Sequence, residues 1–183
     1  MKKISTFILT ALLTGFAAQA QTDKDDWMVG GNFSINTTKN NSQFSLYPSA
    51  GYFFAKNFAA GAQIDLSFGK NGNTKFSTVG VSPFARLYFD LKEDHFKPLI
   101  QSSFGISSTS TKNPTLPNIT TTFTNFFIGG GGAYFINKNV AMDIIAGYDR
   151  SKNKNFDASG GFSFRIGFQV HLLGNEVRET LKK

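Results

Sequence analysis

Apolar and polar residues alternate along most of this chain, most clearly near the C-terminus. Every second residue from Phe162 to Leu172 is Phe, Ile, Val or Leu, and the residues between them are Ser, Arg, Gly, Gln and His. Side chains two residues apart share one face of a strand. The pattern therefore predicts a long final strand, about residues 161–172, with one wholly apolar face.

The same alternation recurs in seven earlier segments. They cover about residues 27–36, 43–54, 58–68, 76–89, 98–107, 121–136 and 140–149. Short connections at 55–57, 90–97 and 137–139 alternate with a second set at 39–42, 69–75, 108–120 and 150–157. Eight strands joined up and down place both termini on one side, so we predict an all-β, eight-stranded, up-and-down antiparallel barrel.

A ten-residue unit recurs 82 positions along the chain, which supports this layout. Residues 51–60 read GYFFAKNFAA and residues 133–142 read AYFINKNVAM. Each predicts a strand, a tight turn with Lys-Asn at its corner, and a second strand. We expect these turns and the two termini to lie on the same rim.

The N-terminus has the three parts of an export signal. Lys2 and Lys3 precede a short apolar stretch, and Ala18-Gln19-Ala20 forms a cleavage motif before Gln21. The signal is therefore predicted to cover residues 1–20 and to be removed from an exported chain. The remaining chain divides into a solvated linker at 21–26, a barrel at 27–172 and a short tail at 173–183.

Charge placement distinguishes a membrane barrel from a soluble one. The predicted strands contain five charged residues, all on the polar face: Asp65, Arg86, Asp143, Asp149 and Arg165. A soluble barrel would carry Lys and Glu on its water-facing side, whereas a charge facing lipid costs a few kcal/mol near the midplane. We therefore predict a transmembrane β-barrel, with a soluble periplasmic barrel as the alternative.

Several of these features together resemble one family. The signal, the two Tyr-Phe units of the repeat, the segment PFARLYF at 83–89 and the aromatic last strand are similar to the small bacterial outer-membrane barrels of the OmpA/OmpX type, in the porin-like superfamily. The resemblance covers about residues 27–172. It implies a monomeric barrel in the outer membrane of a Gram-negative envelope, inserted by the barrel-assembly machinery. The tail is far too short for the periplasmic domain that some OmpA-type members carry.

The sequence offers little for catalysis. The absence of Cys excludes thiolate metal sites and cysteine nucleophiles. His95 and His171 lie at the predicted periplasmic rim without a triad pattern nearby, and both are expected to be hydrated. The run 129–132 (GGGG) lacks the Lys-Ser/Thr of a phosphate loop and is expected to admit a bend or an overlying aromatic ring. We expect no catalytic, cofactor or metal site, no enzyme activity and no nucleic-acid partner.

The strand charges are the candidate functional residues of the interior. An eight-stranded barrel is just filled by side chains, so buried charges must pair or reach water. Counted from the periplasmic turns, Arg86 and Asp143 lie at similar shallow heights, and Asp65 and Arg165 lie deeper, also at similar heights. We predict a charge network of these four residues that plugs the lumen, with a polar gate or narrow solute path as the alternative.

Basic residues dominate the opposite rim. The connections there carry seven of them: Lys39, Lys70, Lys75, Lys112, Arg150, Lys152 and Lys154. The chain as a whole has a formal net charge of +7. Such a rim suits contact with lipid phosphates of an outer leaflet, including those of lipopolysaccharide. The alternative is that these side chains simply keep exposed loops soluble.

Three strand residues interrupt the regular pattern. Pro48 and Pro83 each remove a ladder hydrogen bond, so we predict β-bulges there. Phe76 is out of phase with the strand that follows it and predicts a bulge or a later strand start.

The resulting functional hypothesis is a non-enzymatic outer-membrane barrel with a largely plugged lumen that serves envelope structure or surface and lipid interaction. A narrow channel for small or apolar solutes is the first alternative. A lipid-modifying barrel enzyme is the second, although no catalytic cluster is visible at the outer rim.

Overall fold

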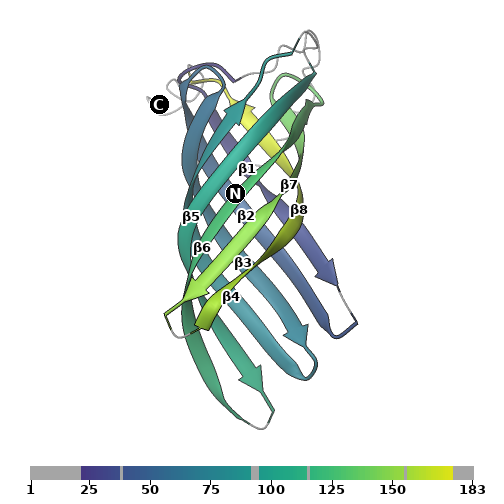
Figure 1. Cartoon of the computed structure of the whole chain (residues 1–183). Coiled ribbons are helices and arrows are strands. Elements are labelled where there is room, and N and C mark those ends of the chain that lie inside the picture. The colour runs from purple at the N-terminus through teal and green to yellow at the C-terminus, as the bar shows by residue number, and fades with distance from the viewer. Residues whose placement is uncertain (1–21, 38, 92–94, 115, 155, 175–183) are drawn as a thin grey trace, which may run out of the picture.

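Eight strands follow one another around a closed antiparallel barrel in this computed structural model (Figure 1). The structure describes residues 22–37, 39–91, 95–114, 116–154 and 156–174. The strands are β1 (Trp27–Thr37), β2 (Asn41–Ala55), β3 (Phe58–Asn71), β4 (Thr74–Tyr88), β5 (Phe96–Asn113), β6 (Leu116–Phe135), β7 (Val140–Asn153) and β8 (Phe156–Leu172). The predicted eight-stranded, up-and-down architecture is confirmed. The predicted signal at 1–20 and most of the tail lie outside the described residues.

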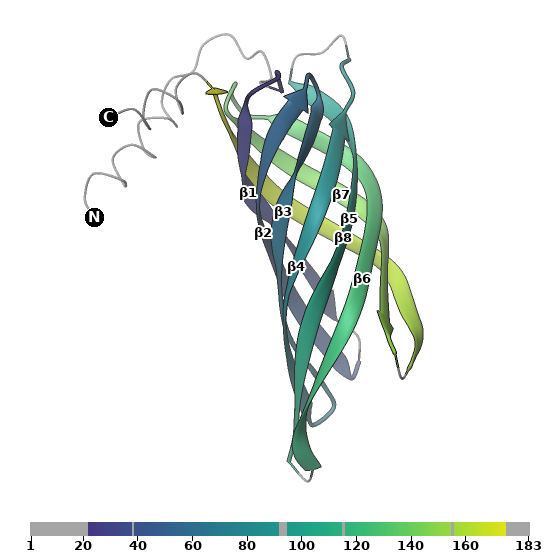
Figure 2. The same ribbon diagram turned by 90° about the vertical axis from the view of Figure 1, so that its left-hand side faces the viewer.

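The two rims of the barrel differ. The start of β1 and the end of β8 lie at one rim, here called the inner rim, together with the turns after β2, β4 and β6 (Figure 2). The four hairpins β1–β2, β3–β4, β5–β6 and β7–β8 project from the other rim, the outer rim. The first strand begins and the last strand ends at the same rim because the number of strands is even.

Strand register gives the barrel a defined tilt. Successive residue pairs lead from Leu172 through Trp27, Tyr52, Ala60, Ala85, Ser102, Ile128 and Tyr148 back to β8 at Phe162. One circuit therefore ends ten residues from its start (172 to 162), which is the shear number of the barrel. A large shear tilts the strands and brings side chains from distant strands into one layer of the interior.

The strands are longer at the outer rim than the sequence predicted. Most of the expected loop at 108–120 is strand, because β5 continues to Asn113 and β6 begins at Leu116. The expected loop at 150–157 is likewise reduced to a turn by the ends of β7 and β8. Both stretches are mostly polar, with Ser and Thr prominent in the first and Lys and Asn in the second, so they lack the one-sided apolar pattern that marks a membrane strand.

The predicted bulges at the prolines are wrong. The β2–β3 ladder skips the pair at Pro48 and resumes in the same register, from Leu46↔Leu66 to Ser49↔Gln63. The β4–β5 ladder does the same at Pro83. Each proline thus removes hydrogen bonding without inserting a residue. The register shifts of the described ladders lie near the strand ends instead.

Phe76 needs no bulge either. It pairs with Gly69 in the unbroken β3–β4 register and faces the interior, where it lines a cavity. The prediction failed because it assumed that a Phe in this strand must face outward.

The outward face is apolar over a broad belt. Phe164 and Phe168 on β8, Ile64 on β3 and Ile106 on β5 are all at least half exposed, as are Phe54 on β2 and Val79 on β4. The inward face carries the buried residues. Four of the five predicted strand charges are among them, and the fifth, Asp149, is half-exposed. Among the described residues, no helix has the length and apolar character needed to cross a membrane.

The segment before β1 is part of the inner rim and not the predicted solvated linker. Thr22 and Asp26 are almost fully buried. The backbone of this segment exchanges hydrogen bonds with Phe53 from both Asp25 and Asp26, and the Asn57 amide donates to the Thr22 carbonyl. The Gly174 amide at the other end of the chain donates to the Asp26 carboxylate. The segment therefore closes over the inner rim and ties the chain ends together.

The two halves of the sequence repeat form different turns. Asn57 adopts a left-handed conformation (φ 65°) in the turn after β2. In the turn after β6 the Asn137 side chain instead accepts hydrogen bonds from the backbone amides of Asn139 and Val140. Both turns lie on the inner rim, as the repeat predicted.

A polar cluster centred on Asp90 braces this rim. The Lys97 ammonium lies 2.7 Å from both the Asp90 carboxylate and the Thr22 hydroxyl, and Lys56 lies 3.3 Å from the same carboxylate. Lys97 belongs to β5 and is buried, although the sequence had placed it in a loop. Hydrogen bonds from Lys97, Asn57 and Lys56 lower the pKa of Asp90 to about 2.

This cluster predicts an acid-sensitive inner rim. The folded-state pKa of Asp90 lies below its ordinary value of 3.8. The carboxylate therefore stabilises the fold above pH 3.8, and this contribution is lost as the pH falls towards about 2. Asp90→Asn should therefore destabilise the barrel at neutral pH, and its difference from wild type should shrink between pH 4 and 2. Urea unfolding in detergent, followed by the fluorescence of Trp27, measures this. In a Lys97→Met background the pH-dependent difference should be much smaller; an equal difference would contradict the assignment to this cluster.

Candidate functional site

The inner half of the lumen is filled by aromatic and apolar side chains. Phe53, Tyr88 and Phe135 are buried around the His171 ring, with ring centroids 5.2–6.1 Å from it. Met28 lies in the same buried cluster. His171 is fully buried, so the prediction of a hydrated histidine is wrong for it. The sequence signal was present, because Phe53 and Phe135 occupy equivalent positions of the repeat and both point inward.

Arg86 forms a complete polar layer above these rings. Its guanidinium lies 2.6 Å from the Asp143 carboxylate, across the lumen from β4 to β7. It also donates two hydrogen bonds to Gln101 and one to the Tyr88 hydroxyl. Arg86 and Asp143 are 1% and 0% exposed in their side chains. The structure thus brings together the pair that the sequence placed at a shallow height, and the two side chains meet inside the lumen.

The second predicted pair does not form. The Arg165 guanidinium lies 2.6 Å from the Asp149 carboxylate, which is 42% exposed, and not against Asp65. Its planar group is held over the rings of Phe127 and Tyr47, at 3.5 and 4.1 Å from their centroids. The direction in which the long Arg165 side chain extends is set by the aromatic rings that it stacks on.

Asp65 is satisfied by neutral donors instead. Gln63 donates to one carboxylate oxygen at 2.6 Å, and Ser82 donates to the other. The four predicted network residues therefore separate into one ion pair, one stacked Arg and one carboxylate held by hydrogen bonds.

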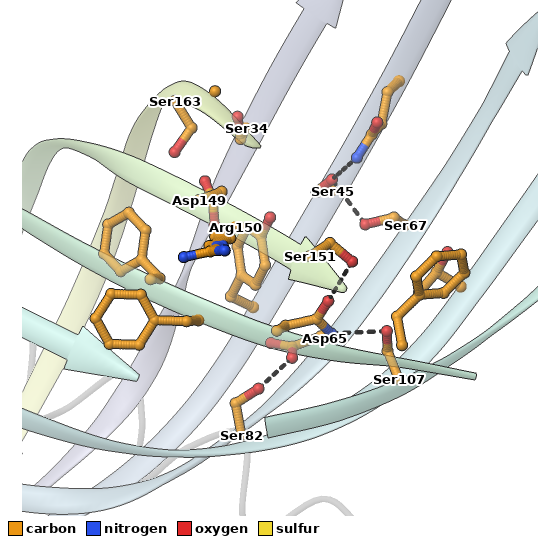
Figure 3. A pocket seen from close by; sticks show the side chains of 18 of the residues that line it. Ser34, Ser45, Asp65, Ser67, Ser82, Ser107, Asp149, Arg150, Ser151 and Ser163 are labelled. Carbon is orange, nitrogen blue, oxygen red and sulfur yellow. Dashed lines mark hydrogen bonds between the residues drawn. The ribbon is translucent and has the colours of Figure 1, made fainter. Parts of the chain in front are cut away.

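A cavity of about 460 Å³ occupies the outer half of the lumen. Most of its lining residues carry a hydroxyl or amide group, and hydrogen bonds link Ser45 to Ser67, Ser151 to Asn125, and Asn125 to Ser107 (Figure 3). Asp65, Asp149 and Arg165 also line it. The sequence did not identify this cavity, because its residues come from all eight strands and each is unremarkable in its own strand.

The seven basic residues predicted for the outer rim are all exposed. Three of them lie directly across from one another on adjacent strands, because Lys75 on β4 pairs with Lys70 on β3 and with Lys112 on β5. By strand alternation all three point away from the lumen. This group, here called the lysine row, concentrates positive charge on the outer wall.

The glycine run on β6 admits neighbouring rings, as the sequence indicated. A Cβ at Gly132 would lie 2.3 Å from the Phe96 ring, and a Cβ at Gly129 would lie 2.6 Å from Phe127. His95 is exposed at the inner rim beside Tyr134. Within the described part of the chain, no three His, Cys, Asp or Glu residues are grouped as metal ligands would be.

The Arg86–Asp143 layer predicts strong coupling between its two charges. Arg86→Gln alone leaves the Asp143 carboxylate buried without its counter-charge and should cost about 3–5 kcal/mol of unfolding free energy. Asp143→Asn should cost a similar amount, whereas the double variant should cost clearly less than the sum. Urea unfolding of the four proteins in detergent gives the coupling energy.

An exposed ion pair provides the control for this cycle. Lys56 and Asp90 are 65% and 45% exposed, so their coupling should fall within about 0–1 kcal/mol. Additive effects of the Arg86 and Asp143 substitutions would show that the layer is held by packing and not by the charges.

No family model and no curated protein sequence matches the chain. Solved structures do resemble it in three dimensions. Neisserial surface protein A is 17% identical, with 80% of this chain and 97% of that chain covered and a TM-score of 0.59. The N-terminal β-barrel domain of Pseudomonas aeruginosa OprF is 14% identical, with 81% and 98% covered and a TM-score of 0.51. Yersinia pestis Ail in a phospholipid bilayer nanodisc is 12% identical, with 80% and 99% covered and a TM-score of 0.51. The chain therefore has the fold of these small eight-stranded outer-membrane barrels.

Proposed function

We propose that the protein is a non-enzymatic barrel of the bacterial outer membrane whose lumen is closed and whose outer rim binds lipid phosphates. The proposed contact with lipid phosphates is based on the lysine row. Like charges directly opposite one another on adjacent strands destabilise a sheet. Three of them in a line, pointing outward, are consistent with an anionic partner that offsets their repulsion.

Membrane placement is supported by the outward apolar belt together with the predicted export signal. The belt would be costly in water, since large contiguous apolar patches on soluble monomers mark sites that something else covers. The solved structures that share the fold are small outer-membrane barrels, which supports placement in the outer membrane. In that orientation the inner rim faces the periplasm and the lysine row lies near the outer-leaflet headgroups, where phosphates of lipopolysaccharide are the available anions. Insertion by the barrel-assembly machinery is part of the same proposal.

The lysine row predicts a phosphate-dependent affinity. Each Lys near an anionic lipid surface contributes about 1 kcal/mol, so Lys70→Gln, Lys75→Gln and Lys112→Gln together should weaken binding of fluorescent lipopolysaccharide at least tenfold. The refolded barrel in detergent is titrated with intact and with dephosphorylated lipopolysaccharide. The matched control replaces Lys24, Lys56 and Lys138 at the inner rim and should bind as wild type does. Equal losses in both triple variants would indicate only a net-charge effect.

A narrow channel is the second candidate, favoured by the outer cavity. Against it stand the Arg86 layer and the aromatic cluster below. We expect liposomes containing the folded barrel to retain small neutral solutes, whereas a variant that combines Phe53→Ala and Phe135→Ala with Arg86→Ala and Asp143→Ala should leak them. Folding is checked by heat-dependent gel mobility. Size-limited efflux through the wild-type barrel would favour the channel.

A further inference from the structure

The barrel wall is incomplete between β1 and β8. Their ladder begins at Trp27↔Leu172 and ends at Phe33↔Ile166. Beyond that point β1 continues to Thr37 and pairs with β2 alone, and β8 continues to Phe156 and pairs with β7 alone. The β1–β2 and β7–β8 hairpins diverge towards their tips (Figure 1). Over the described residues, the two facing strand edges are thus left without a strand partner in the outer part of the seam.

The outer cavity lies beside this seam. Residues on both free edges line it, Ser34 and Asn36 on β1 and Ser159–Ser163 on β8. Phe162, which points outward by strand alternation, belongs to this lining and is 88% exposed. The cavity therefore borders the gap, where no strand pairing joins β1 to β8.

The gap lies at the depth of the outer leaflet in the proposed orientation. Outward apolar residues on β8 run from Leu172 to Phe162. With a rise of about 3.3 Å per residue and a tilt of about 40°, ten residues cover about 25 Å, the height of the apolar band of such barrels. Phe162 and Phe164 therefore mark the upper part of the band. Unpaired backbone groups at this depth require polar partners, because lipid tails offer none.

The outer side of the gap is apolar and the inner side is basic, so the two sides match the tail and the head of an anionic amphiphile. Phe162, Phe164 and Ile35 offer an apolar wall outside it. Inside, Arg165 is 2% exposed, and its Nε and Nη1 atoms have no hydrogen-bond partner in the described structure. Exposed basic residues flank the opening on both hairpins, with Lys39 on one side and Arg150, Lys152 and Lys154 on the other. Arg150 also lines the cavity.

We propose that the gap between β1 and β8 binds one anionic single-chain amphiphile. Its carboxylate or phosphate head enters the cavity towards Arg165 and the unpaired strand edges, and its acyl chain lies along Phe162 and Phe164 on the outer wall. The cavity of about 460 Å³ receives the head group alone, because the acyl chain stays on the outer wall. This inference rests on the membrane placement proposed above but not on the lysine row, which lies on β3, β4 and β5.

Gly161 provides a selective way to close the gap. A Cβ built there meets no atom within 4 Å, so Gly161→Phe fills the cavity mouth without displacing the wall. Gly130 is the matched control, because its Cβ would meet only the Leu99 carbonyl at 3.6 Å and it lies on β6, away from the seam. Arg165→Gln removes the charge, and Arg165→Lys keeps a charge if the Gln variant fails to fold.

The experiment is photocrosslinking of a diazirine-bearing palmitate to the barrel in zwitterionic nanodiscs, with the labelled peptides identified by mass spectrometry. Wild type and Gly130→Phe should be labelled mainly on β8 and β1, and this labelling should be at least tenfold weaker in Gly161→Phe. Unlabelled palmitate and lysophosphatidic acid should compete, and neutral monopalmitoylglycerol should not. Arg165→Gln should abolish this preference for anions, whereas Arg165→Lys should retain it.

Three results would overturn the proposal. Labelling spread evenly around the belt and unchanged in Gly161→Phe would mean ordinary boundary lipid. Equal competition by the neutral amphiphile would remove the role of Arg165. A dimer in native mass spectrometry that Gly161→Phe dissociates, without acyl labelling of the seam, would assign the strand edges to a second copy. Failure of the barrel to insert, seen by heat-dependent mobility, would count against the membrane placement itself and is thereby distinguished from failure of the site.

Discussion

A barrel of eight strands has room inside for little more than one layer of side chains at each level, and the rest of this structure follows from that limit. Any charge that points inward must find its partner within the same narrow section. Arg86 does so by using every nitrogen of its guanidinium, towards Asp143, Gln101 and Tyr88. The layer that results is the polar centre of the fold, and it is the layer that we propose closes the lumen.

The interior changes character along the barrel axis. Below the Arg86 layer the space is occupied by rings packed around His171, and the segment before β1 covers the inner rim. Above it most inward residues carry hydroxyl or amide groups, together with a few rings such as Phe76, and a cavity is left unfilled. The lumen is therefore packed towards the inner rim and hollow towards the outer rim. Arg165, clamped between Tyr47 and Phe127, lies at the boundary between the two regions.

A second constraint applies to the wall, because a closed sheet should leave no free strand edge. The β1–β8 ladder satisfies this constraint only up to the pair Phe33↔Ile166. Above that point the long β7–β8 hairpin departs from β1, and residues on both free edges line the cavity. The lysine row and the gap lie on different strands, and they are the two separate places where we propose that an anionic lipid group binds. The proposed closed lumen and the proposed seam site are compatible, because the first would block passage along the axis and the second would be reached from the side.

The sequence by itself determined the strand number, the up-and-down order, the rim that holds the termini and the face on which each charge lies, because alternation with period two is a local property of the chain. It also placed Arg86 and Asp143 at a common height, since counting residues from a turn measures height along a strand. Other features depend on contacts between strands that are distant in sequence. Arg165 pairs with Asp149 because two rings from other strands direct its side chain. Pro48 and Pro83 keep their register because the neighbouring strands hold it. The gap at the seam exists because the number of residues over which the first strand pairs with the last is set by the tertiary structure.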